Sequence, residues 1–421
     1  MLERKFIREN QDAVRRAIEE KHIPLDFARY LALDSELLAL EQKLQELSAR
    51  RNDLSAEIPA ATGAKKDALL DESKKIKESA AALEAKIAKV KPEYDDLLWR
   101  IPNIPAADAP RGADDSENKV VRREGAPRKF DFPVKSHYDL LVENGWADFE
   151  RISKVSGSRS YALKGAAARL EIALHAFVMD KLTAKGFTMI STPSLAREPA
   201  LFATGHFPSS REDVYYLPSD ELYLSGTAEI PLTSLHAGEI LEENQLPILY
   251  AGYSPCFRRE AGAAGKDTRG LIRVHQFMKV EQYVICRADL EEQKKWHAAL
   301  LAAAEEILRD LELPYQVVEC CTGDMGAGKY KMNDLETWVP SENRYRETHS
   351  CSSLTDWQAR RAGLRYRENG TNKVKYCYTL NNTGIATPRI IAQFLENHQE
   401  KDGRVKLPAA IRPYMNDKEY L

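Results

Sequence analysis

The chain has 421 residues, of which 43% are hydrophobic and 30% are charged, and its formal net charge is -3 at pH 7. This composition is typical of a soluble protein with room for about two to four domains. The near balance of charge excludes a protein that is basic over its whole surface, so any contact with nucleic acid must come from a local patch.

The sequence shows no membrane or secretory segment. No run approaches the roughly 18 apolar residues that a membrane span requires, and the charged start MLERKFIREN lacks the apolar core of a signal peptide. The six cysteines include no C-x-x-C pair, and the neighbours Cys320 and Cys321 do not have zinc-knuckle spacing. We therefore expect reduced, mostly buried thiols in a cytoplasmic protein that does not contact membranes.

Two apolar heptad series occupy the N-terminal quarter of the chain. Apolar residues recur at alternating steps of four and three from Leu33 to Ile58 and again from Leu69 to Ile101, which predicts two coiled-coil helices. The short turn at 59–63 predicts that these helices fold back on each other as an antiparallel arm over about residues 30–100, with legs of roughly 40 to 50 Å. Pro92 lies in the second seam, where we expect it to kink the helix.

Two uses of this predicted arm stay open. Heptads most commonly serve dimerisation, but seams that pair within one chain leave the outer helix faces free. Those faces carry basic residues that suit an RNA backbone, although interspersed acidic residues also fit a merely solvated surface. The basic residues are Arg50, Arg51, Lys65, Lys66, Lys74, Lys75, Lys77, Lys86, Lys89 and Lys91.

A proline- and aspartate-rich stretch divides the chain after the arm. It predicts an N-terminal domain over 1–104, a linker over 105–116 and a globular domain over 117–421. In the globular part, an apolar helix from Leu170 to Gly186 precedes a strand that ends at Pro193. Taken alone, this order also fits plain core packing.

The segment from Tyr250 to Tyr283 holds the densest group of charged and aromatic residues in the chain. Its β-rich ends, Ile248–Phe257 and Leu271–Val284, flank a glycine-broken polar loop, which predicts an antiparallel hairpin. In the second strand the odd-numbered residues share one face because side chains alternate. An edge hairpin with a solvated face is one interpretation. A site for a polyphosphate and a base is the other, and the mixture of charged and aromatic residues favours it: Arg258, Glu260, Arg273, Phe277, Lys279 and Glu281.

Three motifs carry a resemblance to a known family. Phe257-Arg258-x-Glu260, followed after the loop by Arg269-Gly270-x-x-Arg273-x-x-x-Phe277, resembles motif 2 of the class II aminoacyl-tRNA synthetases. The surrounding sequence is similar to the seryl-tRNA synthetase family. The helix and strand over 170–193 resemble motif 1, and the segment 378–397 resembles motif 3, with Arg389 just inside an apolar helix. Neither the HIGH nor the KMSKS signature of the other synthetase class occurs, and no zinc-ligand set of the archaeal form is visible.

The resemblance implies a fold and a function. The expected fold is α+β, with an antiparallel sheet flanked by helices and an N-terminal antiparallel two-helix coiled-coil arm. The expected activity is ATP-dependent attachment of L-serine to tRNA(Ser) through a seryl-adenylate intermediate, and also to tRNA(Sec) where that tRNA is present. The resemblance further implies a homodimer formed through motif 1, an arm that embraces the long variable arm of the tRNA, and Mg²⁺ but no zinc as cofactor.

The family's site residues transfer to matching positions of this sequence. Arg258 and Arg389 are the expected catalytic residues, and Glu347 and Ser350 offer hard oxygen ligands for Mg²⁺. The Thr-x-Glu at 227–229 also fits a helix N-cap, and the two roles can coexist. The residues expected to bind ATP are Arg258, Arg259, Glu260, Arg273, Val274, Phe277, Glu347, Thr348, His349, Ser350 and Arg389. Those expected to bind serine are Thr227, Glu229, Arg258, Glu281, Asn381 and Thr383.

One further segment resembles a different nucleotide-binding motif. The segment from Gly323 to Lys329 nearly spells a phosphate-binding P-loop, but Tyr330 replaces the required Ser or Thr and the following residues predict a strand instead of a helix. Two other functions stay open: an enzyme that makes seryl-adenylate and passes serine to a carrier protein or an amine, and a coiled-coil scaffold with an inactive ATP site. The basic arm argues against the first, and the intact motif residues argue against the second.

Overall fold

The computed structural model of the protein describes residues 1–262 and 269–421. The centre of the predicted hairpin loop, 263–268, lies outside the described residues. The chain divides into two compact units. One unit comprises 3–18 and 23–101, and the other comprises 1–2, 19–22 and 102–421.

The first unit is helical and contains the predicted arm. Two long antiparallel helices follow two short ones, and the side chain of Asp26 caps the third helix by accepting a hydrogen bond from the backbone N of Arg29 at 2.9 Å. This confirms the two-helix arm. The bounds are α1 Arg4–Glu9, α2 Gln11–Glu20, α3 Phe27–Glu57, the 3-10 turn η1 Ile58–Ala60 and α4 Gly63–Arg100.

Apolar contacts along the seam and ion pairs at its sides hold α3 against α4. Arg29 pairs with Glu93 at 2.6 Å, and Arg50 pairs with Glu72 at 2.8 Å. Helix α4 runs on through Pro92. Beyond the proline, Leu98 is buried where the heptad register predicted Leu97. The buried seam residues include Leu33, Leu37, Leu54, Leu69, Ile76 and Tyr94.

The second unit is built on an eight-stranded sheet. Its strand order is β1-β9-β10-β11-β14-β8-β7-β2, and all neighbours are antiparallel except β2 and β7. The bounds are β1 Lys119–Glu124, β2 Thr188–Ser191, β7 Ile248–Phe257, β8 Gln276–Cys286, β9 Tyr315–Glu319, β10 Lys331–Val339, β11 Arg344–Ser353 and β14 Tyr378–Ala386.

Two small sheets and several short helices complete this unit. The small sheets have the orders β13-β12-β6 and β3-β5-β4. Their strands are β3 Leu195–Arg197, β4 Tyr216–Leu217, β5 Leu222–Leu224, β6 Ile240–Glu242, β12 Arg365–Arg367 and β13 Val374–Tyr376. The short helices are α5 His137–Glu143, α6 Phe149–Ser156, α8 Glu198–Thr204, α9 Glu229–Leu235 and α11 Trp357–Ala362. Among the described helices, none is long and apolar enough to cross a membrane.

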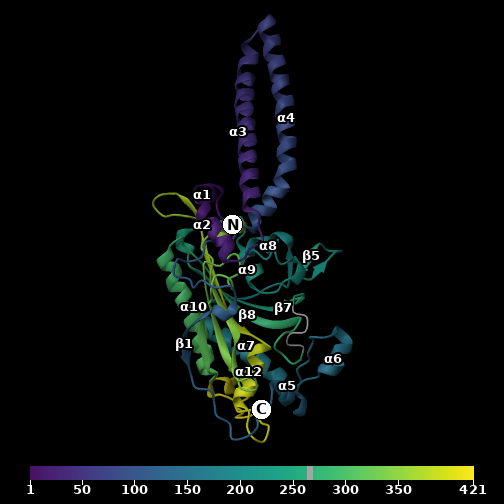
Figure 1. The fold of residues 1–421 in the computed structure, drawn as a ribbon, viewed down its shortest axis with the longest axis vertical. Helices are drawn as coiled ribbons and strands as arrows, with labels where there is room; N and C mark the ends of the chain where they lie inside the picture. Colours follow the sequence, from purple (N-terminus) through teal and green to yellow (C-terminus); the bar gives the residue numbers. More distant parts are fainter. Residues whose placement is uncertain (263–268) are drawn as a thin grey trace. The chain divides into compact units, whose positions relative to one another are not determined.

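Three helices pack on one face of the main sheet. They are α7 (Gly165–Ala184), α10 (Leu290–Asp310) and α12 (Arg389–His398), and their apolar residues share one core with Val280 and Val284 of β8. Because side chains alternate along a strand, the odd-numbered residues of β8 point to the opposite face. The predicted α+β architecture, with its antiparallel sheet and flanking helices, is confirmed (Figure 1).

The predicted strands are present, but some of their ends differ, and β2 ends at Ser191 instead of Pro193. Strand β7 has the predicted bounds, but β8 begins at Gln276 and not at Leu271. The intervening residues form a turn in which the backbone N of Leu271 donates to His137 Nε2 at 3.2 Å. Strand β10 begins at Lys331, two residues after Lys329, so a strand and not a helix follows this segment, as the argument against a P-loop predicted.

The predicted linker is packed against the second unit. Ala106 and Ala109 are buried in a small cluster with Val318 and Met325. Just before them, the side-chain amide of Asn103 donates to the carbonyl of Leu354 at 2.9 Å. The predicted linker is therefore an ordered part of the unit that contains the main sheet. The boundary between the two compact units lies between Ile101 and Pro102.

Candidate active site

Residues from three distant segments line one pocket on the face of the main sheet opposite to α7, α10 and α12. Arg258 follows β7, Arg273 lies in the turn before β8, and Arg389 begins α12, and all three line the pocket. A neighbouring hollow shares the same three arginines and Glu260. Besides the three arginines and Glu260, the first pocket is lined by Ile272, Val274, Phe277, Lys279, Glu347, Thr348, Thr383, Ala386, Thr387 and Pro388.

Arg258 lies over an aromatic ring at the mouth of this pocket. Its guanidinium carbon is 5.2 Å from the ring centre of Phe277, within the range of a cation–π contact. The Nε atom donates to the carbonyl of Gly226 at 3.4 Å. The pairing of Cys256 with Phe277 across the hairpin brings the ring beside the arginine. A flat ring beside a fixed positive charge suits a ligand with a base and a phosphate.

Arg273 has an unsatisfied donor that faces this pocket's charged residues. Its Nη1 atom donates to Glu260 Oε2 at 2.7 Å, whereas its Nε atom is buried and has no hydrogen-bond partner among the described residues. Glu260 has φ of +53°, a left-handed backbone conformation that is uncommon for residues other than glycine. Because buried donors are nearly always satisfied, the free Nε indicates room for an anionic ligand.

Arg389 is held at the start of α12 by acceptors from two other segments. It donates to the Glu347 carboxylate at 3.1 Å and to the carbonyl of Ile272 at 3.1 Å. The N-terminus of a helix carries partial positive charge, so an arginine there needs a nearby anion. In this structure Glu347 supplies that anion.

A β-bulge places Glu347 and Ser350 on the same face of β11. Across β10, Glu336 pairs with Glu347 while Leu335 pairs with His349, so Thr348 is the extra residue of the bulge. In a regular strand, residues three apart point to opposite faces. The bulge reverses this, and the carboxylate and the hydroxyl predicted to bind Mg²⁺ lie on the same side of the sheet. Ser350 itself is not among the residues that line the pocket.

Besides Ser350, two further residues predicted to bind ATP do not line the pocket. Arg259 has an exposed side chain, and its backbone N donates to the carbonyl of Asp213 at 2.9 Å. His349 points to the opposite face of β11, where its Nε2 atom lies 3.1 Å from the carbonyl of Gly384. Burial lowers the pKa of His349 to about 4, so the ring is neutral at pH 7. Its geometry fits a structural role.

The predicted serine-binding residues form a buried polar cluster beside the pocket that the arginines line. Glu229 accepts hydrogen bonds from the side-chain amides of Asn381 at 2.8 Å and Gln358 at 2.7 Å. Thr227 Oγ1 lies 3.4 Å from Glu281 Oε2 and accepts from the backbone N of Glu229, the first residue of α9, at 3.2 Å, although the N-cap position itself is Ala228. Thr383, opposite Glu281 on β14, is buried as well. The structure thus brings these five predicted residues together.

Two lysines set the charge of this cluster, and neither was predicted to bind a ligand. Lys279 pairs with Glu281 and donates to Thr227 Oγ1 at 3.2 Å. Burial nevertheless raises the pKa of Glu281. Burial also acts to raise the pKa of Glu229, but the charge of Lys329 and further polar neighbours outweigh it and lower that pKa. Lys279 was recognisable by its alternation with Phe277 and Glu281, whereas no pattern marked Lys329 or Gln358.

A glycine in β7 allows α9 to approach the sheet. A Cβ atom at Gly252 would lie 2.8 Å from the Cβ of Ala228 and 2.8 Å from the Cδ1 of Leu232. Real Cβ contacts are not this short, so the backbone of α9 packs on β7 only because position 252 has no side chain. This close approach carries Thr227 and Glu229 to the buried polar cluster.

The outer faces of the arm keep most of the predicted basic surface. Arg50 is an exception, because it is bound to Glu72 and to Glu57, and Lys91 pairs with Asp95. The other lysines are exposed and have no ion pair within the described residues: Lys65, Lys66, Lys74, Lys75, Lys77, Lys86 and Lys89.

Comparisons with known proteins match both parts of the chain. Residues 215–398 match the family described as tRNA synthetase class II core domain (G, H, P, S and T). Residues 1–105 match the seryl-tRNA synthetase N-terminal domain.

Full-length relatives and solved structures agree with these matches. The serine–tRNA ligase of Deinococcus radiodurans is 53% identical over 421 residues, covering 100% of this chain and 99% of that protein. That of Symbiobacterium thermophilum is 44% identical, covering 98% of each. The crystal structure of seryl-tRNA synthetase from Pyrococcus horikoshii complexed with ATP has a TM-score of 0.92 at 39% identity, covering 100% of this chain and 99% of that one. The cytoplasmic enzyme from Naegleria fowleri in complex with AMP has a TM-score of 0.85 at 27% identity, covering 98% and 96%.

Proposed function

Because the chain belongs to the seryl-tRNA synthetase family of class II aminoacyl-tRNA synthetases and is an ATP-dependent serine–tRNA ligase, we propose that it works through seryl-adenylate on one face of its sheet. The observation that carries this proposal is the convergence of Arg258, Arg273 and Arg389 on a pocket beside buried carboxylates. Three cations suit a triphosphate, and the carboxylates suit an amino group and a hydroxyl.

ATP would lie across the arginines in a bent form. Phe277 stacks on adenine, and the backbone near Val274 with Glu260 reads the base. Arg273 and Arg389 hold the outer phosphates, which the unpartnered Nε of Arg273 supports. Glu347 and Ser350 fit Mg²⁺ because the bulge turns both toward the same side. When bound, Mg²⁺ neutralises phosphate charge, and Arg389 exchanges its contact with Glu347 for one with phosphate.

The first step needs positioning more than proton transfer. A serine carboxylate oxygen attacks the α-phosphorus in line, a P–O bond forms, and the bond to pyrophosphate breaks. Arg258 bridges the serine carboxylate and the α-phosphate and stabilises the charge on the transition state. No protein nucleophile takes part. The terminal ribose hydroxyl of the tRNA then attacks the carbonyl of the adenylate and releases AMP.

Serine selection rests on the buried polar cluster. Glu281, Thr227 and Glu229, with Asn381 and Thr383, surround the amino group and hydroxyl of the substrate. A site built to hydrogen-bond a hydroxyl rejects an analogue without it by up to about 10⁴ to 10⁵. Alanine is therefore excluded by unsatisfied polar groups, and threonine is excluded by size in a closed pocket.

The partners follow from the two units. The exposed lysines of α4 bind the backbone of tRNA(Ser) by charge and shape, and tRNA(Sec) where it is present. The exposed apolar residues Ile172 (59% exposed) on α7 and Met189 (49%) on β2 support a homodimer through this helix and strand. The cytoplasmic location stays a prediction.

Amino-acid-dependent ATP–pyrophosphate exchange across the twenty amino acids, followed by charging of total tRNA, tests this proposal. We expect exchange with serine alone and charging of serine-specific tRNA. Exchange with threonine or proline in place of serine would refute the substrate. Exchange without any charging would favour the alternative enzyme that passes serine to a carrier protein or an amine.

A further inference from the structure

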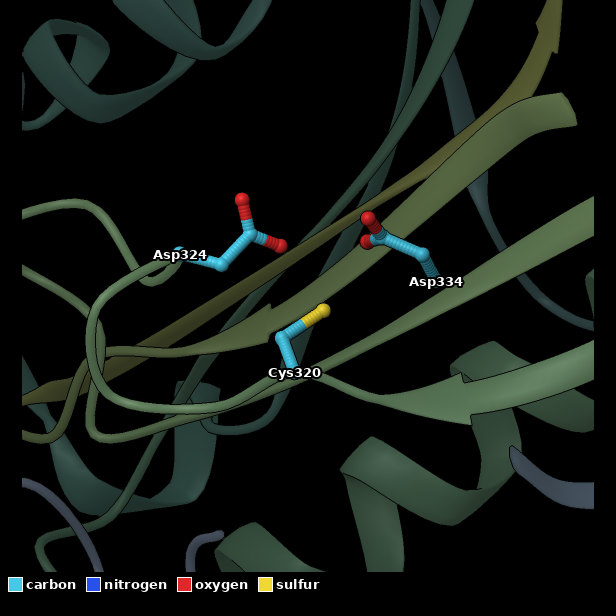
Figure 2. A group of neighbouring side chains, drawn as sticks. All are labelled: Cys320, Asp324 and Asp334. Carbon is cyan, nitrogen blue, oxygen red and sulfur yellow. The ribbon is translucent and has the colours of Figure 1, made fainter. Parts of the chain in front are cut away.

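A second group of metal-ligating side chains lies on the side of β10 that adjoins Ser350, and it uses other residues than Glu347 and Ser350. Cys320 follows β9, Asp324 lies in the turn after it, and Asp334 is on β10. The sulfur and one oxygen from each carboxylate all lie within 4.8 Å of one another. Figure 2 shows the two carboxylates and the thiol directed into a common space between the turn and the strand.

Asp334 is buried without a partner for one of its oxygens. The residue is 7% exposed, and its Oδ1 atom has no hydrogen-bond partner among the described residues. No described Lys, Arg or His side chain forms an ion pair with Asp324 or Asp334, and Asp324 accepts a hydrogen bond only from the side-chain amide of Asn118, at 2.9 Å. A buried carboxylate oxygen without a partner is costly, and a cation bound between the two carboxylates would supply that partner.

The surrounding surface adds further negative charge. On the paired strands Asp334 lies opposite Ser350, and Glu336 lies opposite Glu347. Two convergent carboxylates in such surroundings are the donor set that divalent cations prefer, and a thiol at the same distance supplies a third ligand.

We propose that Asp324 and Asp334, with the sulfur of Cys320, bind a divalent cation distinct from the one expected at Glu347 and Ser350. The carboxylates suit Mg²⁺ or Mn²⁺, and the sulfur adds affinity for softer cations such as Cd²⁺. The bound cation ties the turn at 321–325 to β10. This site needs no nucleotide, so it does not rest on the proposed function.

Mn²⁺ uptake by the nucleotide-free full-length protein tests the carboxylate ligands. Electron paramagnetic resonance of free Mn²⁺ should report one site in the wild-type protein. Asp324→Asn and Asp334→Asn should each weaken it by about tenfold or more, whereas Glu347→Gln should change it by less than about threefold. Absence of uptake without ATP, or loss of uptake only in Glu347→Gln, would overturn the proposal. Loss of serine-dependent exchange in Glu347→Gln with Mn²⁺ uptake retained would leave it standing.

Cd²⁺ tests the sulfur independently and does not require the carboxylate variants to fold. Binding should give a thiolate-to-cadmium absorption band in the ultraviolet that is lost in Cys320→Ser. Cys321→Ser is the matched control, because Cys321 is the neighbouring buried thiol and its Sγ donates to the carbonyl of Asp114 at 3.2 Å. A band that survives in Cys320→Ser would contradict the proposed ligand set.

Discussion

Arg258 stands between the aromatic ring of Phe277 and the backbone of Gly226, where adenylate and amino acid meet in the proposed complex. Two of its contacts come from segments about 20 to 30 residues away, so its orientation depends on the whole sheet face. A charge held in place before the reaction needs no reorganisation when the transition state forms.

We expect Arg258→Ala to lower serine-dependent pyrophosphate exchange by about 10² to 10³, the range found when one preorganised donor is removed. Arg258→Lys should recover little, because an ammonium cannot bridge two acceptors as a planar guanidinium does. Arg287→Ala is the control, since Arg287 pairs with Glu292 beyond the far end of β8. If Arg258→Ala lowered exchange no more than Arg287→Ala does, the proposed catalytic role of Arg258 would be wrong.

Gly252 tests whether the close approach of α9 shapes the serine pocket. Gly252→Ala places a methyl group against Ala228 and Leu232, so we expect about 1 to 3 kcal/mol of destabilisation and a higher KM for serine, with the KM for ATP less affected. Gly326→Ala is the control, because the nearest atom to its added Cβ is Lys329 Cγ at 4.0 Å. Thermal unfolding and exchange kinetics measure both effects. Equal behaviour of the two variants would contradict the packing argument.

At the scale of elements, α7 and α10 are joined by an ion-pair cluster that titrates in acid. Lys181 and Lys185 bind Glu306 at 2.8 and 2.5 Å, and these hydrogen bonds lower the pKa of Glu306 to about 2. The folded-state pKa lies below the unfolded value of about 4.3, so the stabilisation is present above about pH 4.5 and is lost as the pH falls toward 2.

Glu306→Gln should therefore lower stability at pH 7 and have little effect near pH 2. The side chain is 38% exposed, so solvent screening limits the expected loss to about 0.5 to 1 kcal/mol. Glu291→Gln on the same helix is the control. Glu291 pairs with Lys294, but its side chain is 74% exposed, so this substitution should not change stability in a pH-dependent way. Chemical unfolding at a series of pH values distinguishes them. A Glu306→Gln effect independent of pH would show that packing and not charge is responsible.

The elements could be predicted where local pattern determines them, and not where tertiary contacts do. The heptad pattern predicted the arm, and the alternation of Phe277, Lys279 and Glu281 predicted the charged face of β8. The late start of β8 depends on a hydrogen bond to His137, over 130 residues away in sequence. The bulge at Thr348, which turns His349 away from the pocket, depends on the register with β10 and leaves no mark in the sequence. The motif residues Arg258, Arg273 and Arg389 line one pocket, as the motifs predicted. Two residues next to motif positions, Arg259 and His349, do not line it.

At the scale of the whole molecule, the two compact units correspond to two tasks in the proposed function. Arg258, Arg273 and Arg389, and the serine-binding residues, all belong to the unit that contains the sheet, whereas the exposed lysines belong to the helical unit. The helical unit has its own apolar seam and ion pairs, and its base is fixed by Tyr94 donating to Asp34 at 3.0 Å. Shortening the arm above this base should leave the sheet unit intact.

The most direct measurement compares serine-dependent pyrophosphate exchange with tRNA charging in one protein that lacks residues 30–100. A second protein, which lacks only 41–82 and retains Tyr30, Asp34 and Tyr94, guards against damage at the base of the arm. We predict that exchange stays within about threefold of the wild-type rate while charging falls by about a hundredfold or more, because the sheet alone activates serine and the arm captures the tRNA. An equal loss of both activities in the two shortened proteins would contradict this division of labour.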